Sequence, residues 1–442
     1  MKKLFTTLSN IWKIEDLRAR ILFTLLCLLI YRIGSFIVIP GVDSASLDSG
    51  QAKEGLLGLL NMFAGGSFSR ASIFALGVMP YISASIVVQL LGIAVPYFQK
   101  LQKEGESGRK KINQVTRYLT IIITALQAIG YVRSQITPDA RLLSEPLFTL
   151  SSMFILTAGT MFVMWLGEKI TDKGIGNGIS LIIMVGIIAQ LPFGIISEFT
   201  SRMGAQGGLI SFIVEIAALF LVVMFTILIV QGVRKIPVQY AKKIVGAKQY
   251  GGVRQYIPLK VNAAGVMPII FAQAIMFIPT TIGSFFPSAQ SSFLAAFSDY
   301  TSLTYNLTFA FMIIAFTFFY TAITVNPVQM SDDMKKNGGF VPGVKPGATT
   351  GAYIDEVISK ITLPGSVFLA LIAIMPSIAI ILGVNSQFAH FYGGTSLLIL
   401  VGVVLDTLQQ IESHLLMRHY DGLMKTGRIK GRTPVQAGGP VI

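Results

Sequence analysis

Few residues in this chain are of types and spacings that could carry out chemistry. The three histidines form no metal-ligand pattern, and the sequence contains no H-E-x-x-H motif. A run of alternating glycines at Gly174, Gly176 and Gly178 lacks the spacing of a phosphate-binding loop. Ser180 and Ser396 follow glycines in apolar stretches, as an intramembrane nucleophile would, but neither has a paired base in the sequence around it. We therefore expect no catalytic residue, no metal site and no cofactor.

The elements that would have to position any such residues are membrane spans. Of the 442 residues, 53% are hydrophobic and 13% are charged, and soluble proteins carry about twice that charged fraction. The single cysteine, Cys27, excludes an intrachain disulfide. A span needs about 20 apolar residues. By that rule ten spans are predicted, near residues 20–40, 73–97, 117–135, 148–168, 177–197, 209–231, 263–285, 304–325, 363–384 and 394–414.

The distribution of basic residues orients these spans. With both termini in the cytoplasm, 29 of the 35 Lys and Arg lie on the cytoplasmic side and only 5 on the other. Because five spans are an odd number, two five-span halves would be inverted relative to each other. We expect an N-terminal half over 1–197 that begins with a surface helix, an external hinge linker over 198–208, a C-terminal half over 209–414 and a cytoplasmic tail over 415–442.

One apolar segment cannot be a span of its own. From Gly55 to Phe98 the chain is apolar over roughly twice the ~30 Å of a bilayer core, yet the charges allow one crossing there. The glycines at 65 and 66 provide a break, and Ser69 could cap the following span. The piece before them, about 55–70, is either a helix lying flat on the outer surface or a short re-entrant helix that plugs a central cavity.

Two long loops on the cytoplasmic side carry the remaining signals. Loop 232–262 has seven basic residues and no acidic one, and its arms, 236–240 and 256–261, alternate as paired strands do. Loop 326–362 contains a helix start at Ser331 and a stop at Gly338. These charges either fix the topology alone or form a docking surface for an acidic partner.

Two further classes of protein compete with a channel. A secondary transporter would need ion ligands near the midplane, and its candidates, Arg32, Glu215, Asp406 and Glu412, are dispersed over three spans. An intramembrane hydrolase would need a base beside Ser180 or Ser396. Neither requirement is met by an obvious cluster in the sequence.

Several strings resemble those of the SecY family of protein-conducting channels, in order along the chain. They are Asn61-Met62-Phe63-Ala64-Gly65-Gly66, Ser69-Arg70-Ala71-Ser72-Ile73-Phe74-Ala75-Leu76-Gly77, Met79-Pro80-Tyr81-Ile82-Ser83-Ala84-Ser85-Ile86, Lys103-Glu104-Gly105-Glu106-Ser107-Gly108-Arg109, Gly174-Ile175-Gly176-Asn177-Gly178-Ile179-Ser180 and Gly393-Gly394-Thr395-Ser396-Leu397-Leu398-Ile399. The resemblance implies an all-α polytopic protein whose ten helices surround an hourglass pore in two inverted halves.

It also implies roles for particular residues. An aliphatic pore ring would consist of Val78, Ile82, Ile179, Ile183, Ile270 and Ile399. The plug would include Leu56, Leu57, Leu60, Asn61, Met62, Phe63, Gly65 and Gly66. Gln89 and Asn177 would be polar groups near a lateral gate formed by spans 2, 3, 7 and 8, unless they only make interhelical hydrogen bonds. Docking residues would be Lys242, Lys243, Lys248, Arg254 and Lys345, the last standing where the family usually has Arg.

The function implied is passage of unfolded secretory polypeptides across the bacterial cytoplasmic membrane, with apolar segments released sideways into lipid. No motor motif is present, so energy would come from a partner. The implied partners are the small membrane subunits SecE and SecG, the motor ATPase SecA, the ribosome, signal-bearing polypeptides and membrane lipid, with YidC and SecDF as further candidates.

Overall fold

A computed structural model of the chain defines the fold, and it describes most of the sequence. The described residues are 12, 14–43, 58, 61–204, 208–240, 243–245, 248–250, 254–273, 275–276 and 301–425. The predicted surface helix before residue 12, the first plug residues Leu56, Leu57 and Leu60, and the docking residue Lys242 lie outside them.

The described part of the chain is mainly helical. Its membrane helices are α2 (Glu15–Gly34), α4 (Met79–Ala94), α6 (Glu106–Gln135), α7 (Glu145–Lys173), α8 (Gly178–Gly204), α9 (Gly208–Gln231), α12 (Leu303–Thr324), α14 (Ala348–Ile381) and α16 (Gly394–Lys425). Shorter helices are α5 (Pro96–Lys103), η2 (Pro138–Ala140), α13 (Pro327–Lys336) and α15 (Ser386–Ala389). A helix satisfies its own backbone hydrogen bonds, which lipid cannot do for it.

Seven described helices are long and apolar enough to cross a membrane, and α4 with α5 makes an eighth if that bent pair is one span. These eight match predicted spans 2–6 and 8–10, and α2 lies at the position of the first. Predicted span 7 is described only in part, as helix near 267–276. The bend of 102° between α4 and α5 falls at Val95, whose extended backbone is the conformation favoured before Pro96.

Some predicted boundaries are wrong. The second span does not begin near residue 73, because turns continue to Val78 and α4 starts at Met79; Ser69 caps no helix. Residues 198–204 belong to α8 and not to a linker. The helix predicted to start at Ser331 starts at Pro327, because Asn326 accepts the amide of Gln329 at 3.1 Å as an N-cap.

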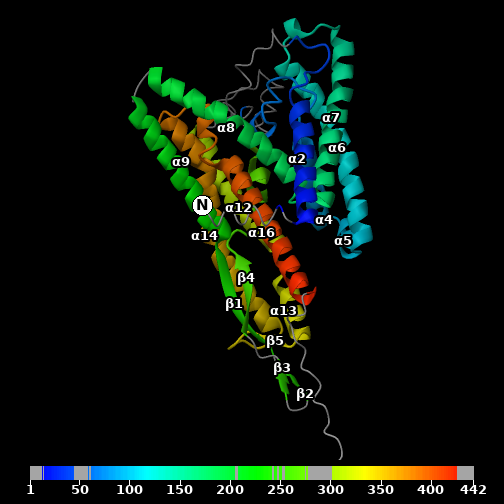
Figure 1. Cartoon of the computed structure of the whole chain (residues 1–442), viewed down its shortest axis with the longest axis vertical. Helices are drawn as coiled ribbons and strands as arrows, with labels where there is room; N and C mark the ends of the chain where they lie inside the picture. Colours follow the sequence, from blue (N-terminus) through cyan, green and yellow to red (C-terminus); the bar gives the residue numbers. More distant parts are fainter. Residues whose placement is uncertain are drawn as a thin grey trace, which may run out of the picture.

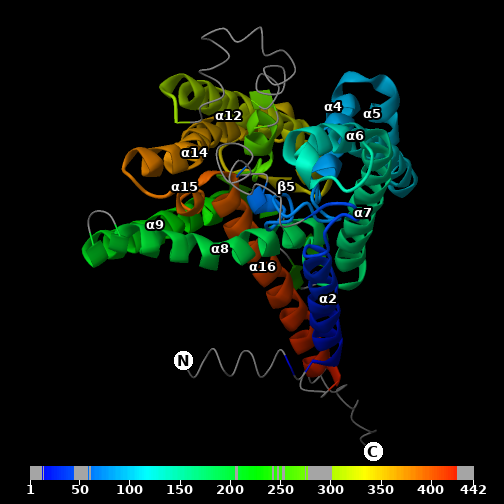
Figure 2. The same cartoon turned by 90° about the horizontal axis from the view of Figure 1, so that it is seen from above.

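The two halves are separate bundles joined on one side (Figure 2). In that view α2, α4, α5, α6 and α7 gather on one side and α9, α12, α14 and α15 on the other, with α16 between them. Among the described elements, α8 is the main bridge, since it packs on α7 of its own half and on α9, α15 and α16 of the other.

The two cytoplasmic loops fold together as one small unit. Strand β1 (Val233–Tyr240) pairs antiparallel with β4 (Arg254–Lys260), with Ile236 opposite Ile257, and β5 (Gly339–Phe340) adds to the other edge of β1. A short hairpin, β2 (Lys243–Val245) with β3 (Lys248–Tyr250), extends beyond. The sheet buries Ile236 and Val238 against α13 and the start of α14. The predicted pairing of the loop arms is therefore confirmed, and Figure 1 shows this unit at one end of the long axis.

Candidate functional site

Five of the six predicted ring residues meet in one buried apolar cluster. Val78, Ile183 and Ile399 are 4%, 6% and 6% exposed within it, and Ile82 and Ile179 are partly buried against it. Val78 comes from the turn before α4, Ile183 from α8 and Ile399 from α16, so both halves contribute. This cluster is hereafter called the waist.

The sixth predicted residue, Ile270, does not belong to this cluster. It is partly buried, and Val266, one helical turn earlier, packs against the cluster instead. Val266 also packs against the core of the C-terminal half. Sequence reasoning missed it because a four-residue shift along one helix keeps the same face, and only the depth of the helix distinguishes the two positions.

The segment predicted to be a plug, of which residues 61–70 are described throughout, lies against the waist. Met62 and Phe63 are 4% and 6% exposed and belong to the same cluster. A cavity of about 10 Å³ remains between plug and waist. Its lining is Phe63, Ala64, Leu76, Gly77, Val78, Met79 and Ile183. That volume is about one water molecule, so the contact is nearly dry. Burial at the centre favours a plug over a helix lying on an outer surface.

The plug backbone is held at Gly65. Its carbonyl oxygen accepts hydrogen bonds from Arg32 Nη1 at 2.8 Å and from Arg70 Nη2 at 3.0 Å. Gly65 has φ +64°, and a Cβ there would lie 2.9 Å from the Cα of Gly186 on α8. Glycine is therefore required both by the left-handed backbone and by the close approach of the two chains.

The plug is also closed on itself by short-range bonds. The carbonyl of Asn61 accepts the amide of Gly66 at 2.8 Å, and its side-chain oxygen accepts the amide of Ser69 at 3.0 Å. Tyr131 of α6 donates its hydroxyl to the carbonyl of Phe68 at 2.6 Å. The segment is a compact turn fastened at its base, with Met62 and Phe63 in the waist cluster and Ala64 and Phe68 in the core of the N-terminal half.

The predicted gate residues make local hydrogen bonds only. Gln89 on α4 donates to Ser85 Oγ at 3.3 Å, one turn earlier on the same helix. Asn177 is exposed, and its side-chain oxygen accepts the amide of Ser180 at 3.3 Å at the start of α8. The interhelical bonds considered as the alternative are not formed by either residue in the described structure.

The docking residues belong to the cytoplasmic unit. Lys243 and Lys248 lie in the β2–β3 hairpin and Arg254 at the start of β4. Lys345 is exposed in the turn before α14. That turn is fixed from both sides, because Thr350 Oγ1 donates to the carbonyl of Lys345 at 2.8 Å and Ser331 Oγ to that of Gly347 at 2.6 Å.

The hydrogen-bonded ion cluster at the outer end of α8 was not expected from the sequence. Arg202 pairs with Glu198 at 2.8 Å and with Glu215 of α9, and it donates to the carbonyl of Gly383 at 2.7 Å. Glu198 is fully buried, and its second oxygen accepts the amide of Asn385 at 2.8 Å. We call these residues the hinge cluster. Asp406 and Glu412, the other transporter candidates, are exposed on α16.

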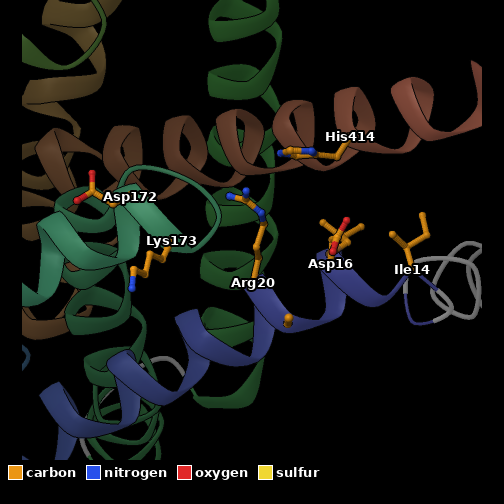
Figure 3. Close-up of a pocket in the computed structure, with 8 residues that line it drawn as sticks. Ile14, Asp16, Arg20, Asp172, Lys173 and His414 are labelled. Atoms are coloured by element: carbon orange, nitrogen blue, oxygen red, sulfur yellow. The ribbon is translucent and has the colours of Figure 1, made fainter. Parts of the chain in front are cut away.

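A cleft of about 430 Å³ opens at the cytoplasmic ends of α2, α7 and α16 (Figure 3). It is lined by Ile14, Asp16, Leu17, Ala19, Arg20, Asp172, Lys173 and His414. Its charged side chains are mixed in sign, and no group of three His, Cys, Asp or Glu able to hold a metal ion exists among the described residues. This cleft is not a metal centre.

The fold and the central site define a polytopic membrane channel, closed at its middle by apolar side chains. A family model described as SecY matches residues 72–408. Proteins named protein translocase subunit SecY are similar over 96% of this chain, at 43% identity in Streptomyces scabiei, 44% in Halalkalibacterium halodurans and 41% in Chlamydia muridarum, covering 100%, 100% and 99% of those proteins. The chain belongs to the SecY family and is a protein-conducting channel subunit.

Solved structures agree on the fold. One described as "The structure of a protein conducting channel" has a TM-score of 0.62 at 18% identity and covers 90% of this chain and 92% of its own. A canine Sec61 structure, described as part of a ribosome-channel complex, has a TM-score of 0.59 at 17% identity, with the same coverage of 90% and 92%. At these identities the likeness is one of fold alone.

Proposed function

We propose that the waist is the constriction through which this channel passes unfolded secretory polypeptides, and that residues 55–70 are its plug. The observation that carries the proposal is the burial of Met62 and Phe63 in the same cluster as Val78, Ile183 and Ile399. Ile270 stays in the proposed ring beside Val266, because one turn of helix separates them and either can face the pore as the halves move.

The apolar character of the waist explains how it can be both tight and permissive. A narrow hydrophobic constriction excludes water and ions by dewetting. The same aliphatic side chains offer no hydrogen-bonding groups to a passing polypeptide, so the polypeptide is not held there. Releasing the tip of the plug requires that Met62 and Phe63 leave apolar contacts and that the fastening at Gly65 rearranges, while the bond from Tyr131 to Phe68 can hold its base.

Lateral release of apolar segments is supported by the uneven joining of the two halves. Among the described elements, α8 makes extensive contacts with α9, α15 and α16, whereas no extensive contact joins α4 to α12. We therefore place the lateral opening on the side of α4 and α12, where Gln89 lies on α4. Asn177 begins α8, and its exposed side chain faces outward from the helix start.

The basic cytoplasmic unit is the proposed docking surface for the ribosome and the SecA motor, which would supply the energy. Exposed Lys345 on a fixed turn and the basic hairpin are suited to phosphate contacts with RNA. SecE and SecG, signal-bearing polypeptides and membrane lipid are the other proposed partners, with YidC and SecDF as additional candidates. The chain is a multi-pass membrane protein, and we place it in the bacterial cytoplasmic membrane with both termini inside.

A crosslink tests the plug. Met62→Cys combined with Ile183→Cys, in a chain whose Cys27 is replaced by Ser, should be joined by a short thiol reagent in resting membranes. The joined protein should not transport until it is reduced. The same plug cysteine combined with Leu142→Cys, which is exposed on the outer loop, is the matched control and should not crosslink. If the 62–183 pair fails to crosslink, residue 62 does not lie against the waist in the resting channel and the proposed plug is wrong.

A labelling experiment tests the topology. Single cysteines at the exposed positions Asp139 and Ser201 should react with a membrane-impermeant thiol reagent added outside. A cysteine at Lys345 should react only after the membrane is opened. Labelling of position 345 from outside intact cells would show that the proposed orientation of the chain in the membrane is wrong.

A further inference from the structure

Arg32 near the end of α2 and Arg70 beside it lack the carboxylate partners that several other described arginines have. Arg117 forms a bidentate pair with Glu168, and Arg202 pairs with two glutamates. Arg141 pairs with Glu145 and also donates to two backbone carbonyls. Arg32 and Arg70 form no ion pair with any residue in the described part of the chain, although both are partly buried.

The two guanidinium groups converge on the same point. Both donate to the carbonyl oxygen of Gly65, at 2.8 Å and 3.0 Å. Both also lie over the ring of Phe36, with the guanidinium carbons 5.1 Å and 4.3 Å from its centre. Two like charges held this close repel each other, and a single neutral carbonyl offsets little of that repulsion.

The donors of this pair are largely unused. A guanidinium carries five N–H donors, and each arginine makes one hydrogen bond here. The Nε of Arg70 is buried without an acceptor. A buried donor without an acceptor is rare in folded proteins, and this one is available to a ligand that supplies an acceptor oxygen. The neighbouring position, Gly66, has no side chain, and a Cβ there would meet Gln190 Nε2 and lie 3.0 Å from Arg70 Nη2.

We propose that Arg32 and Arg70 together form a binding site for a phosphate oxyanion on the outer side of the channel. Guanidinium groups bind phosphate through paired hydrogen bonds, and two of them match its charge. Phe36, over which both lie, is 56% exposed, as are its neighbours Ile33 at 58% and Ile37 at 50%. The exposed apolar side chains put the open side of the site next to lipid, so the phosphate can belong to a headgroup or be free.

The site also bears on the plug, in a step that rests on the proposed function. An anion between the guanidinium groups would relieve their repulsion while both still hold the Gly65 carbonyl. Binding would therefore fasten the plug more tightly. Binding of the anion itself does not depend on the plug acting as one.

The test measures binding and stability without transport. The full-length chain, purified with its membrane partners, is titrated with inorganic phosphate in place of chloride at constant pH and ionic strength. Radiolabelled phosphate should bind saturably, with one ion per chain in equilibrium dialysis. The melting temperature should rise by about 2 °C at tenfold excess over Kd.

The variants assign the site. Arg32→Gln with Arg70→Gln should lose saturable binding and the thermal shift, and Arg70→Lys should weaken binding while keeping the charge. Arg133→Gln removes an exposed arginine at the end of α6 and should bind as the native chain does. Equal binding by the native chain and the double variant, or no saturable binding at all, overturns the proposal.

A lipid arm distinguishes the two sources of phosphate. The chain is reconstituted in nanodiscs of phosphatidylglycerol or of a neutral glycolipid without phosphate. If the headgroup occupies the site, phosphatidylglycerol should block labelled phosphate and the glycolipid should not. If free phosphate is the ligand, both nanodiscs should bind it equally. Either result supports the site, provided that phosphate binding is lost in the double variant Arg32→Gln with Arg70→Gln.

Discussion

Two of the places where the halves of this channel meet are built from opposite kinds of contact. At the waist, Val78, Ile183 and Ile399 meet Met62 and Phe63 of the proposed plug through apolar side chains. At the hinge cluster, Arg202 and the buried Glu198 of α8 meet Glu215, Gly383 and Asn385 through an ion pair and hydrogen bonds. Apolar contacts are non-directional and can be replaced by any other apolar surface. A buried ion pair tolerates no such exchange, because a separated partner is left charged in a dry environment. In the proposed function, the part that opens is therefore apolar and the part that stays joined is ionic.

The largest effect is expected from removing the charge at the centre of the hinge cluster. Arg202→Leu leaves Glu198 buried without its cation, which costs about 3–5 kcal/mol. We expect a large fall in the melting temperature of the purified chain, measured by loss of the monodisperse peak on heating. Arg202→Lys keeps the charge but loses the planar, fork-shaped set of donors. Its melting temperature should lie between those of the native chain and Arg202→Leu. A native melting temperature for Arg202→Leu would show that the cluster does not hold the halves.

A polar side chain at the waist should break its seal without unfolding the protein. Ile183→Asn places an amide in a nearly dry cluster, where leaving it without a partner costs about 1–3 kcal/mol and favours water entry. The resting channel should leak ions several-fold more in planar bilayers. Ile188→Asn on the exposed face of the same helix is the control. Equal ion leak through both variants would mean that the constriction of the pore is formed by other residues.

The plug seat should respond to one added methyl group. Gly65→Ala imposes a left-handed backbone on a residue with a Cβ, at a cost of about 1–2 kcal/mol, and the Cβ meets Gly186. We expect a loosened plug, seen as a lower yield of the 62–183 crosslink. In contrast, Gly130→Ala on α6 adds a Cβ with nothing within 4 Å and should leave the yield unchanged.

The smallest effect sharpens the role of Asn177. Its observed contact is an N-cap bond, so Asn177→Ala should cost about 1 kcal/mol and Asn177→Asp almost nothing in stability. If the residue acts only as a cap, both variants should crosslink a stalled signal-bearing nascent chain as well as the native protein. A loss of crosslinking in Asn177→Asp would indicate direct contact with the signal instead.

The same contrast explains which features could be predicted from the sequence. The family resemblance, not the spacing, implied Val78 with Ile82 and Ile179 with Ile183, whereas alternation in the sequence itself predicted the pairing of β1 with β4. The position of a helix along the membrane normal leaves no pattern in its sequence. The sequence therefore provided no reason to prefer Val266, which packs against the waist, over Ile270, which does not. The turns before Met79 were also missed, because their apolar residues look like a span and only the positive φ at Gly65, Gly66, Ala71 and Gly77 reveals them.

The hinge cluster was missed for a different reason. Glu198 and Glu215 belong to successive antiparallel helices, and Gly383 and Asn385 follow much later in the chain. No local pattern joins such residues. An acidic or basic residue near a span end is read first as a topology signal, and Arg202 was counted in that way.

Helix α14 has a mechanical consequence. It is one long helix from Ala348, beside the fixed turn that carries Lys345, to Ile381 near the hinge cluster, and Pro364 and Pro376 lie within it. At 1.5 Å per residue it is a lever arm of roughly 50 Å. A tilt of about 10° applied at its cytoplasmic end displaces the other by roughly 9 Å. Because α12 packs along α14, a tilt of α14 would carry α12 with it, so a force at the Lys345 turn would reach the membrane part of the C-terminal half.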